Sequence, residues 1–579
     1  MRKINKILKH LRSELLSLLE AMSVSEKVIF GALSAVLIIT SILLMKSASD
    51  EFSTIVPAEG GTINEGIAGY PRYINPLLPI TDAGRDLSRL IYSGLMKVGK
   101  EGSITADLAS KLAVSPDGTT YTAILRDDIY FQDNVPVTAY DVEFTIKRAV
   151  DPVIKSPKAA DWNGVDIKVI DAKTIEFKLK KPYAPFAENL TLGILPEHIW
   201  KDVGSDAFLF SEFNFEPVGS GPYMIKDVKR SSAGLPTYYH LVPWNKSSLE
   251  KPYIKDVFIH FYPNEESLVA GYRAGEIESM GSISPANASS TNASIGTILS
   301  VPLPRFYAVF FNQNQAKIFA DKSVRQALSL ATPQDEIIKK VLLGYGTPIE
   351  SPLPPNISLV SSLVDEKALD KAKAILANDG FTISTSTKIL TQKAKKGGSA
   401  MALSFSIAVP DVPELKATAE ILKAAWEKLG ANVSIQVFDN SDLEQNVIVP
   451  RKFDALLFGE SIGRDTDLFA FWHSSERLSP GLNIAGYTNA KVDKLLESAR
   501  TTSDESKRDG LYQQFEKEIV NDVPAIFLYA PDFIYVVPKS LKGVSIKSLA
   551  EASERFSNIA SWYMEEEFIW QMPWMKRKN

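Results

Sequence analysis

The chain has 579 residues, of which 45% are hydrophobic and 23% charged, and its formal net charge is −5. This length is too great for one core and predicts about two to four domains, while the lack of cysteine excludes disulfides, thiolate nucleophiles, cysteine-ligated metals and a lipidated N-terminal cysteine. The acidic balance, without a basic stripe in the bulk of the chain, argues against a nucleic-acid partner.

An apolar segment near the N-terminus predicts a membrane anchor. Residues 28–45 carry no charge and are flanked by Lys27 and Lys46. As a helix this segment would span about 27 Å, close to the hydrocarbon thickness of a bilayer. The first twelve residues hold five cations and no acid, which favours a cytoplasmic N-terminus and an exterior location for the rest. We expect a basic cytoplasmic tail over 1–27, a transmembrane anchor over 28–46 and a linker over 47–57.

Two alternatives to the anchor are a cleaved signal peptide, with Ser47-Ala48-Ser49 as its cleavage site, and a buried core helix. The long leader and the flanking lysines favour the anchor. Residues 1–46 carry a balance of +4 and the remainder −9, as expected for an acidic exterior protein on a basic tail. The tail is expected to form an amphipathic helix that lies on the membrane or contacts a partner, because apolar residues recur at helical spacing: Ile4, Ile7, Leu8, Leu11, Leu15, Leu18 and Leu19.

Strand and helix patterns then mix along the exterior region. Alternation of apolar and polar residues predicts strands over 119–127, 166–179 and 253–262. Three- and four-residue spacing predicts helices over 321–332, 414–430 and 490–500, the second ending at Gly430 and followed by a strand, ANVSIQVF. This alternation indicates a mixed α/β architecture. The Ser/Thr/Lys/Gly-rich stretch 382–402 is predicted to be an exposed loop.

The segment FQDNVPVTAYDVEFTIKRAV, residues 131–150, predicts a tight turn followed by a helix. Asn134 can adopt the left-handed conformation that the turn needs. Thr138 is expected to cap the helix together with Asp141, which explains this acidic residue without any catalytic role. The expected buried stripe consists of Ala139, Val142, Ile146 and Ala149.

This segment resembles the strand–turn–helix signature of the peptide/nickel class of extracellular solute-binding proteins, family 5, which serve ABC importers. Asn134 replaces the usual glycine of the turn. Further motifs follow in the family's order, from about Gly60 to about Gly543: YINPL, RLIYSGLMKV, DLASKLAVSPDGTTYTAILRDDIYF, PVGSGPYMI, FNQNQAKIFADKSVRQALSLATPQDEIIKKVLLGYGTPIESPLPP, RKFDALLFG, YTNAKVDKLLESAR and NDVPAIFLYAPDFIYV.

The resemblance implies a two-lobed clamshell of the periplasmic-binding-protein type, with three domains. Two chain crossings near Arg305–Phe311 and Ala530–Ile534 would let the lobes rotate and enclose a ligand. The implied partners are the permease and ATPase subunits of an ABC importer, and a monomer is expected. The implied boundaries are 58–95, 200–305 and 531–579 for lobe I, 96–199 for an inserted domain II, and 306–530 for lobe II.

The resemblance also implies binding residues for a peptide, the leading ligand. In peptide binders of this class an acidic residue pairs with the peptide's α-amino group, in the segment here spelled GESIGRDTDLFAFWHSS, residues 459–475. The acidic residues of this segment could equally belong to a solvated loop that caps the following helix. Its tryptophan, Trp472, could equally be part of the core. No cofactor, metal or catalytic residue is expected. The candidate binding residues are Glu460, Asp465, Asp467, Trp472, Asn483 and Tyr487 in lobe II, with Glu65 and Tyr70 in lobe I.

Enzyme motifs do not support a catalytic alternative. The chain has no H-E-x-x-H, G-x-S-x-G or phosphate-loop motif. GSGPY, residues 219–223, lacks the lysine and following helix of a phosphate loop and is interpreted as a structural turn. The histidines show no ligand spacing, and Asp465 with Asp467 fixes no carboxylate separation suited to glycoside hydrolysis. A secreted hydrolase, a receptor for a nickel chelate, sugar or opine, and a sensor with the same fold remain as alternatives.

Overall fold

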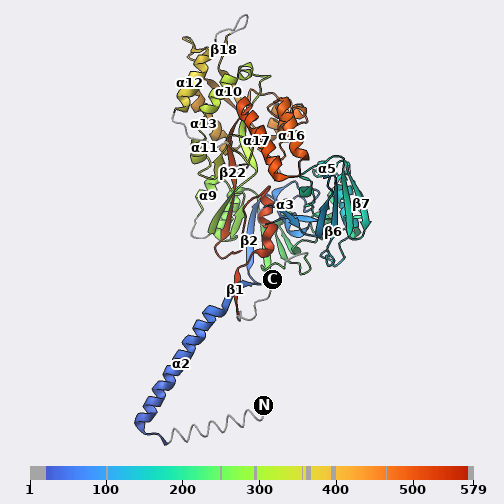
Figure 1. Ribbon diagram of the computed structural model, residues 1–579, viewed down its shortest axis with the longest axis vertical. Helices are drawn as coiled ribbons and strands as arrows, with labels where there is room; N and C mark the ends of the chain where they lie inside the picture. Colours follow the sequence, from blue (N-terminus) through green and yellow to red (C-terminus); the bar gives the residue numbers. More distant parts are fainter. Residues whose placement is uncertain are drawn as a thin grey trace. The chain divides into compact units, whose positions relative to one another are not determined.

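Figure 1 shows the computed structural model, which describes residues 21–99, 102–247, 251–291, 296–354, 357–359, 367–392, 400–464 and 466–570. The chain falls into two compact units. Unit 1 comprises Met1–Glu59 and Glu565–Asn579, and unit 2 comprises Gly60–Met564. The amphipathic pattern predicted for the cytoplasmic tail lies in residues 1–20, outside the described part of the chain.

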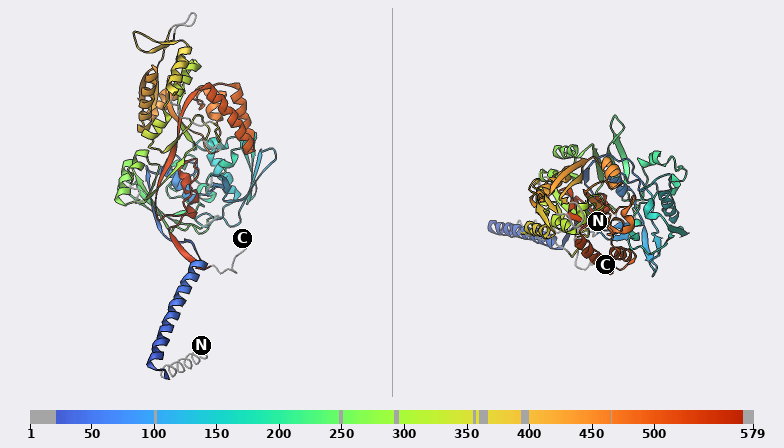
Figure 2. Two further views of the ribbon diagram at one scale, coloured as in Figure 1. Left: turned by 60° about the vertical axis from the view of Figure 1, so that its left-hand side comes forward. Right: turned by 90° about the horizontal axis from the view of Figure 1, so that it is seen from above.

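Unit 1 contains the helix α2 (Val24–Phe52) and a ribbon of two antiparallel strands, β1 (Ser53–Ala58) and β23 (Glu565–Trp570). Within the described residues α2 is the one helix long and apolar enough to cross a membrane, over Val24–Met45. None of that stretch is buried, so the core-helix interpretation is wrong. The expected linker over 47–57 is also regular structure, because the helix continues to Phe52 and β1 pairs with β23, which Figure 2 shows in red beside the end of α2.

Unit 2 is built on a sheet of twelve strands that runs through both halves of the unit. Its order is β20-β19-β21-β14-β22-β12-β2-β11-β10-β9, with β13 and β15 also paired to β22. Parallel pairs join β2 to β11 and β12, and β19 to β20 and β21. The strands are β2 (Thr62–Ala68), β9 (Tyr223–Arg230), β10 (Pro236–Pro243), β11 (Asp256–Tyr262), β12 (Ser279–Gly281), β13 (Gly296–Pro302), β14 (Arg305–Phe311), β15 (Gly346–Pro348), β19 (Ser404–Pro410), β20 (Asn432–Phe438), β21 (Ala455–Ser461) and β22 (Ala525–Pro538).

The fourteen-residue strand β22 belongs to both halves. Its first part pairs with β14, where Tyr307 lies opposite Tyr529. Its second part pairs with β13, up to Pro302 opposite Asp532. Two neighbouring segments, between β13 and β14 and near the middle of β22, therefore carry the chain from one half to the other.

The hydrophobic cores divide at these crossings. Two core clusters draw their buried residues from 63–301 and 533–562, and two others from 306–530. Because apolar packing stops at the crossings, unit 2 consists of two lobes with separate cores. We call them lobe I (63–301 and 533–562) and lobe II (306–530).

The expected domain II has its own antiparallel sheet, in the order β5-β6-β8-β7. Its buried residues, including Phe177 and Phe186, nevertheless belong to the same cluster as Leu87 and Tyr239 of lobe I. The elements of this region and lobe I are β3 (Met96–Val98), β4 (Ile104–Ala106), β5 (Ala109–Val114), β6 (Thr120–Leu125), β7 (Val165–Asp171), β8 (Thr174–Leu179), α3 (Asp82–Ile91), α4 (Ala139–Ala149), α5 (Ala159–Trp162), α6 (Phe186–Asn189), α7 (Glu197–Trp200), η1 (Phe208–Phe210), η2 (Glu212–Asn214), α8 (Glu265–Ala274), α9 (Pro285–Ser289) and η6 (Ala552–Ser561).

Lobe II carries most of the longer helices. The stretch 382–402, expected to be an exposed loop, contributes to a small sheet instead, because Leu390 and Gln392 are buried; residues 393–399 lie outside the described part. The elements are η3 (Lys317–Ala320), α10 (Lys322–Leu330), α11 (Gln334–Lys340), α12 (Ala368–Asn378), β16 (Phe381–Ile383), β17 (Leu390–Gln392), β18 (Met401–Ala402), α13 (Pro413–Leu429), α14 (Asn440–Asp442), η4 (Leu443–Ile448), α15 (Phe469–Trp472), η5 (Ser474–Arg477), α16 (Ala490–Thr501) and α17 (Glu505–Asp522).

The predicted turn at Asn134, the cap of α4 and the end of α13 are confirmed. Asn134 has a φ of +71° in its turn, and Asp141 accepts hydrogen bonds from the Thr138 N–H at 2.8 Å and hydroxyl at 2.7 Å. The predicted stripe of α4 is buried. Gly430, with a φ of +102°, ends α13 in the left-handed conformation that glycine adopts without strain.

Candidate functional site

A cavity of about 810 Å³ lies where lobe I, domain II and lobe II meet. This volume is typical of sites for small organic ligands. Charged and polar side chains dominate its wall, unlike the apolar lining of many ligand pockets. Its charged lining residues are Asp82, Arg85, Arg89, Lys158, Asp161, Glu188, Arg305, Asp467, Asp532, Glu551 and Glu554.

The crossing strands form part of this wall. Arg305 and Tyr307 of β14 line the cavity, as does Ser461 of β21, which lies directly opposite Arg305 in the ladder. Since side chains alternate across a strand, the intervening residue Phe306 and its partner Glu460 point to the other face, into the lobe II core. Arg305 is exposed and donates to no side chain or carbonyl in the described part of the chain, so its charge is available in the cavity.

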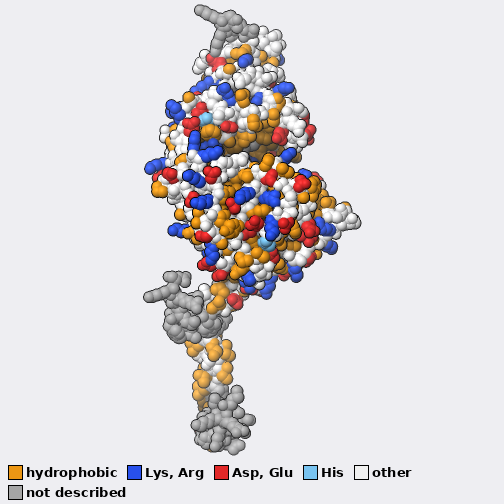
Figure 3. Space-filling view, turned by 90° about the vertical axis from the view of Figure 1, so that its right-hand side faces the viewer, with side chains coloured by type: hydrophobic (Ala, Val, Ile, Leu, Met, Phe, Trp, Pro, Cys, Tyr) orange, Lys and Arg blue, Asp and Glu red, His pale blue; other side chains and the backbone are white. Residues whose placement is uncertain are grey.

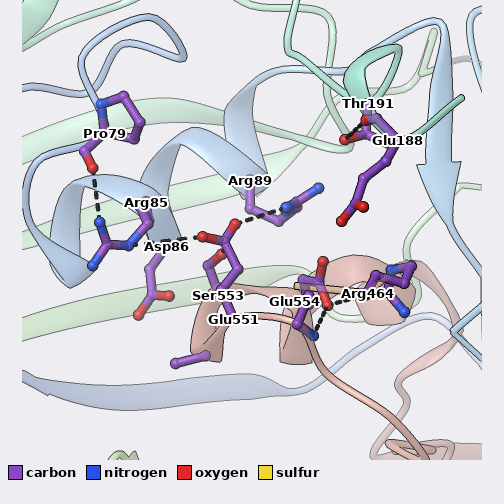
Figure 4. A network of polar contacts seen from close by, with 12 residues as sticks. Pro79, Arg85, Asp86, Arg89, Glu188, Thr191, Arg464, Glu551, Ser553 and Glu554 are labelled. Atoms are coloured by element: carbon purple, nitrogen blue, oxygen red, sulfur yellow. Dashed lines mark hydrogen bonds and ion pairs between the residues drawn. The ribbon is translucent and has the colours of Figure 1, made fainter. Parts of the chain in front are cut away.

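A chain of ion pairs covers the lobe I side of the cavity (Figure 4). Arg85 donates to the Pro79 carbonyl at 2.7 Å and pairs with Asp82, and Arg89 lies 3.1 Å from Glu551. Burial alone would raise the pKa of Glu551, but Arg89 and its other partners hold that pKa below its usual value. These side chains bind one another and form a charged wall.

Arg464 joins all three parts beside the cavity. Its Nη1 donates to the Gly102 carbonyl at 2.6 Å, and its Nη2 pairs with the Glu554 carboxylate, which also accepts the Ala550 N–H at 2.6 Å. The two side chains are 10% and 5% exposed. Gly102 has a φ of +85°, a conformation that other residues adopt only with strain, and a Cβ there would lie 2.8 Å from the Arg464 Nη1 and displace it.

Asp467 is the predicted carboxylate that lies in the cavity, but it already has partners. Arg500 approaches it at 2.7 Å through Nη2 and 2.8 Å through Nε, and the Tyr183 hydroxyl of domain II donates to it at 3.4 Å. Asp467 also accepts the Phe469 N–H at 3.2 Å, as a helix-capping loop would. Asp465 lies outside the described residues.

Glu460 is buried instead of facing the cavity. It is 4% exposed, and neither of its carboxylate oxygens has a hydrogen-bond partner among the described residues. Desolvation raises its pKa well above the usual value, and the charge of Arg451 offsets only part of this effect. Glu460 therefore lies on the core face of β21 and does not line the cavity, where a ligand contact was expected.

Three other predicted contacts of lobe II also serve the core. Trp472 is fully buried against Phe310 and Phe527. Asn483 donates to the Tyr487 carbonyl at 2.9 Å, and the Tyr487 hydroxyl donates to Asp522 at 2.7 Å. Trp472 thus lies among the aromatic side chains of the lobe II core and does not line the cavity.

The two predicted contacts of lobe I lie away from the cavity as well. Glu65 is fully buried and accepts hydrogen bonds from Arg555 at 2.9 Å and from Tyr535 at 2.9 Å. Arg555 also binds Asp86 at 2.6 Å. Tyr70 packs beside Phe261, with ring centroids 6.4 Å apart. Both have structural partners that the sequence pattern does not reveal.

Comparison with known proteins gives the family. The family model of "Bacterial extracellular solute-binding proteins, family 5 Middle" matches residues 103–477, more than half of the chain. The chain belongs to this family. It is similar to the oligopeptide-binding protein AppA of Bacillus subtilis (strain 168), with 28% identity over 525 residues covering 88% of this chain and 92% of AppA. It is similar to the dipeptide-binding protein of Escherichia coli (strain K12), with 25% identity over 520 residues covering 85% and 93%.

Solved structures agree with the family 5 assignment. AppA from Bacillus subtilis, in complex with a nonapeptide, has a TM-score of 0.67 and 26% identity, covering 88% of this chain and 100% of that one. NikZ from Campylobacter jejuni, in complex with Ni(L-His), has a TM-score of 0.68 and 25% identity, covering 87% and 99%. The mixed α/β, periplasmic-binding-protein-like fold is thereby confirmed. These relatives are binding proteins, consistent with a chain that is not an enzyme.

Most of the residues that line the cavity were not predicted from the sequence, although a signal existed. The crossings were expected at Arg305–Phe311 and Ala530–Ile534, and these ranges contain Arg305 and Asp532, both of which line the cavity. The described residues contain no cluster of histidine and acidic side chains suited to a metal ion. The wall of the cavity presents charged and hydrogen-bonding side chains.

Proposed function

We propose that this family 5 protein captures a small charged solute, with a short peptide as the leading candidate, outside the cell and delivers it to the permease and ATPase subunits of an ABC importer. The names of the relatives support this proposal: AppA and the Escherichia coli protein are called oligopeptide- and dipeptide-binding. The ligand would occupy the cavity between the lobes. The protein would act as a monomer.

The observation that carries the proposal is the mixed charge of the cavity wall around an unpaired Arg305. A peptide presents a carboxylate at one end and an ammonium at the other. Arg305 would take the carboxylate by a charge-assisted hydrogen bond. Asp161 would attract the ammonium, since its single ion pair in the described structure, with Lys158, is 3.9 Å long. Partial burial raises the pKa of Asp161, and a bound cation would oppose that shift.

Lobe closure would trap the ligand. The two crossing segments are short, so the lobes could rotate with small changes confined to residues near Arg305 and Asp532. The ion pair between Arg464 and Glu554 would form in the closed state and break in the open state. The same would hold for the hydrogen bond that the Ala184 N–H donates to the Arg500 carbonyl, which is 3.0 Å long. Each of these contacts joins lobe II to the rest of unit 2.

Helix α2 would hold the protein on the cell membrane, with the N-terminus in the cytoplasm and both lobes outside. Its apolar stretch Val24–Met45 has the length of a bilayer span. The basic residues before it support this orientation. Basic and acidic side chains are interspersed over the face of unit 2 seen in Figure 3, in keeping with a soluble exterior body.

A second candidate is a non-peptide solute such as a nickel chelate, sugar or opine. The observation in its favour concerns Asp467, one of the three carboxylates considered for a peptide's α-amino group. Arg500 already binds Asp467 through two nitrogens. A sensor with the same fold is tested by the neighbouring genes, since genes for a permease and an ATPase beside this one would argue for transport. A secreted hydrolase is tested by a broad hydrolase screen, in which activity would argue for an enzyme.

A thermal-shift experiment on residues 50–579 tests the ligand class. Pooled short peptides are expected to raise the melting temperature, since a ligand at 100 times its Kd stabilises the folded state by about 2.7 kcal/mol. Nickel chelates, sugars and opines form the comparison arms, and mass spectrometry identifies any co-purified solute. A shift with one of these and with no peptide would replace the peptide by that solute. No shift with any of them would contradict the proposed binding function.

A further inference from the structure

The wall of the cavity carries more acidic than basic side chains. Seven of its lining residues are acidic and four are basic. Arg464 and Arg500 lie outside this lining set and pair with Glu554 and Asp467, so they compensate two of the carboxylates. One negative charge remains in excess. A peptide with neutral side chains brings one ammonium and one carboxylate and leaves this excess unbalanced, whereas a ligand with one additional cation neutralises it.

Asp532 has no cationic partner in the described part of the chain. It lines the cavity from the middle of β22. Its Oδ2 accepts a hydrogen bond of 2.5 Å from the Ser300 hydroxyl, and its Oδ1 has no hydrogen-bond partner among the described residues. Partial burial raises the pKa of Asp532, and the Ser300 hydrogen bond opposes this effect. An ionised carboxylate can accept about four hydrogen bonds, so a cation beside Asp532 would supply bonds that the protein does not.

Asp532 lies close to Arg305, the cation proposed to hold the ligand's carboxylate. Asp532 is opposite Pro302 in the ladder of β13 and β22. The next residue, Leu303, donates its N–H to the Pro531 carbonyl at 3.2 Å, and Arg305 then begins β14, which pairs with the same strand. Because neighbouring strands are about 5 Å apart and rise about 3.3 Å per residue, the backbones of Arg305 and Asp532 are less than about 10 Å apart. Both residues line the cavity, so one ligand residue can contact both.

The charges of the cavity give a bound peptide a direction. Under the proposed function Arg305 holds the C-terminal carboxylate, and Asp161, on domain II, attracts the N-terminal ammonium. Asp532 lies at the Arg305 end, so the ligand group beside it belongs to the C-terminal residue. Lysine and arginine carry their charge at the end of a long aliphatic stem. Such a side chain can reach Asp532 while the carboxylate of the same residue stays with Arg305.

From these observations we infer that the ligand is a short peptide whose C-terminal residue is basic, and that Asp532 selects it by binding the ammonium or guanidinium group of that residue. This inference rests on the proposed function and refines its ligand class. The contact is a charge-assisted hydrogen bond between a carboxylate and a cation, which is stronger than a bond between neutral groups. It leaves Ser300 in place as the donor to the Asp532 Oδ2.

Isothermal titration calorimetry of the full chain in detergent tests this selection with three matched sets of alanine peptides, each two to five residues long. The first set ends in lysine, the second begins with lysine, and the third ends in norleucine, which resembles lysine without its ammonium group. We expect the first set to bind roughly 10- to 100-fold more tightly than the third, because hydrogen bonds to charged groups contribute that much to affinity. The second set should bind with an affinity close to that of the third, because its lysine lies at the other end.

Variants of Asp532 provide the second arm. Asp532→Asn removes the charge at nearly constant size and is expected to abolish the preference for the first set, while the affinity for the norleucine set stays unchanged. Asp532→Glu keeps the charge and should retain part of the preference. Asp411→Asn is the matched control, because Asp411 is an exposed carboxylate that pairs with Lys416 and does not line the cavity. Unchanged binding of the norleucine set also shows that each variant is folded.

The outcomes separate this inference from the proposed function. Absence of binding by all three sets would overturn the peptide as the ligand, and this inference with it. Equal binding of the three sets by the wild type would overturn the basic C-terminal residue alone, and this comparison needs no variant. A preference for the first set that is as large in Asp532→Asn as in the wild type would overturn the assignment to Asp532.

Discussion

Arg305 lines the cavity, and no acidic side chain of the described structure neutralises its charge. Its replacement is therefore expected to affect ligand affinity. Arg305→Gln should weaken binding of a ligand that carries a carboxylate by roughly 10- to 100-fold, because a hydrogen bond to a charged group contributes about 1.5–3 kcal/mol. Isothermal titration calorimetry would measure the loss. Arg477→Gln, an exposed arginine outside the cleft, is the matched control. Equal ligand affinities of Arg305→Gln and Arg477→Gln would show that Arg305 does not contact the ligand.

Glu460 should affect stability and its pH dependence instead of binding. Its pKa is raised in the folded protein from a usual value of 4.5. The folded state therefore holds the proton more tightly than the unfolded state, and the wild type loses stability as pH rises above about 4.5 toward the folded-state pKa. Glu460→Gln removes this loss, so the variant should gain up to about 1.4 kcal/mol relative to wild type for each pH unit in that window.

Chemical denaturation between pH 4 and pH 8 would measure this difference. The pH-dependent part of the difference in unfolding free energy between wild type and Glu460→Gln should vanish at the acid end, because there the carboxyl binds its proton in the unfolded state as well. Ligand affinity should stay unchanged, because Glu460 lies on the core face of β21. A pH-independent difference in stability would mean that the carboxyl does not titrate in this window.

At the scale of single elements, the turn before α4 gives a clear test of backbone conformation. Asn134 has a φ of +71°, which asparagine tolerates and glycine adopts freely. Asn134→Ala should cost about 1 kcal/mol of unfolding free energy, whereas Asn134→Gly should stay within about 0.5 kcal/mol. Lys246 donates to the Asn134 side chain at 2.8 Å, a contact that both variants lose. The difference between them therefore reports the backbone alone.

The cross-lobe pair of Arg464 with Glu554 should control the balance between open and closed forms. Breaking a buried ion pair costs about 3–5 kcal/mol, and here this cost would fall on the closed form. Arg464→Gln should therefore lower ligand affinity and enlarge the radius of gyration measured by small-angle scattering with ligand present. Arg508→Gln, which loses a bond to the Thr502 carbonyl within lobe II, is the control. Compact scattering and full affinity in the Arg464 variant would show that the pair is not a latch.

Element patterns were predictable where one face meets a core. The spacing of Leu415, Ala419, Leu422 and Trp426 predicts α13, and alternation predicts strand structure where β7 and β8 lie, but not the turn between them. Burial of Gln392 was not predictable, because it depends on distant partners: its side chain donates to the Asp379 carbonyl at 3.0 Å. Glu460 and Ser461 show the same limit in the site. They are adjacent, and only the strand register decides which one faces the cavity.

For the whole molecule, the principal test concerns the anchor. The full chain is expected in the membrane fraction, released by detergent and retained in high salt, because about 22 apolar helical residues cross the bilayer. Residues 53–579 should be largely soluble after a salt wash. Sequencing the N-terminus of the mature protein is the decisive measurement, since a start at or after Ser49 would identify a cleaved signal peptide.

Strand β22 has a consequence for how the protein is made. It lies between β14 and the strands of lobe I, and it begins only at residue 525 of 579. Until it is synthesised, the central edge of each lobe's sheet lacks its neighbour, and both remain incomplete while most of the polypeptide already exists. Since domains fold as units and unpaired strand edges favour aggregation, both lobes pass through a late stage of synthesis in which their sheet edges are exposed.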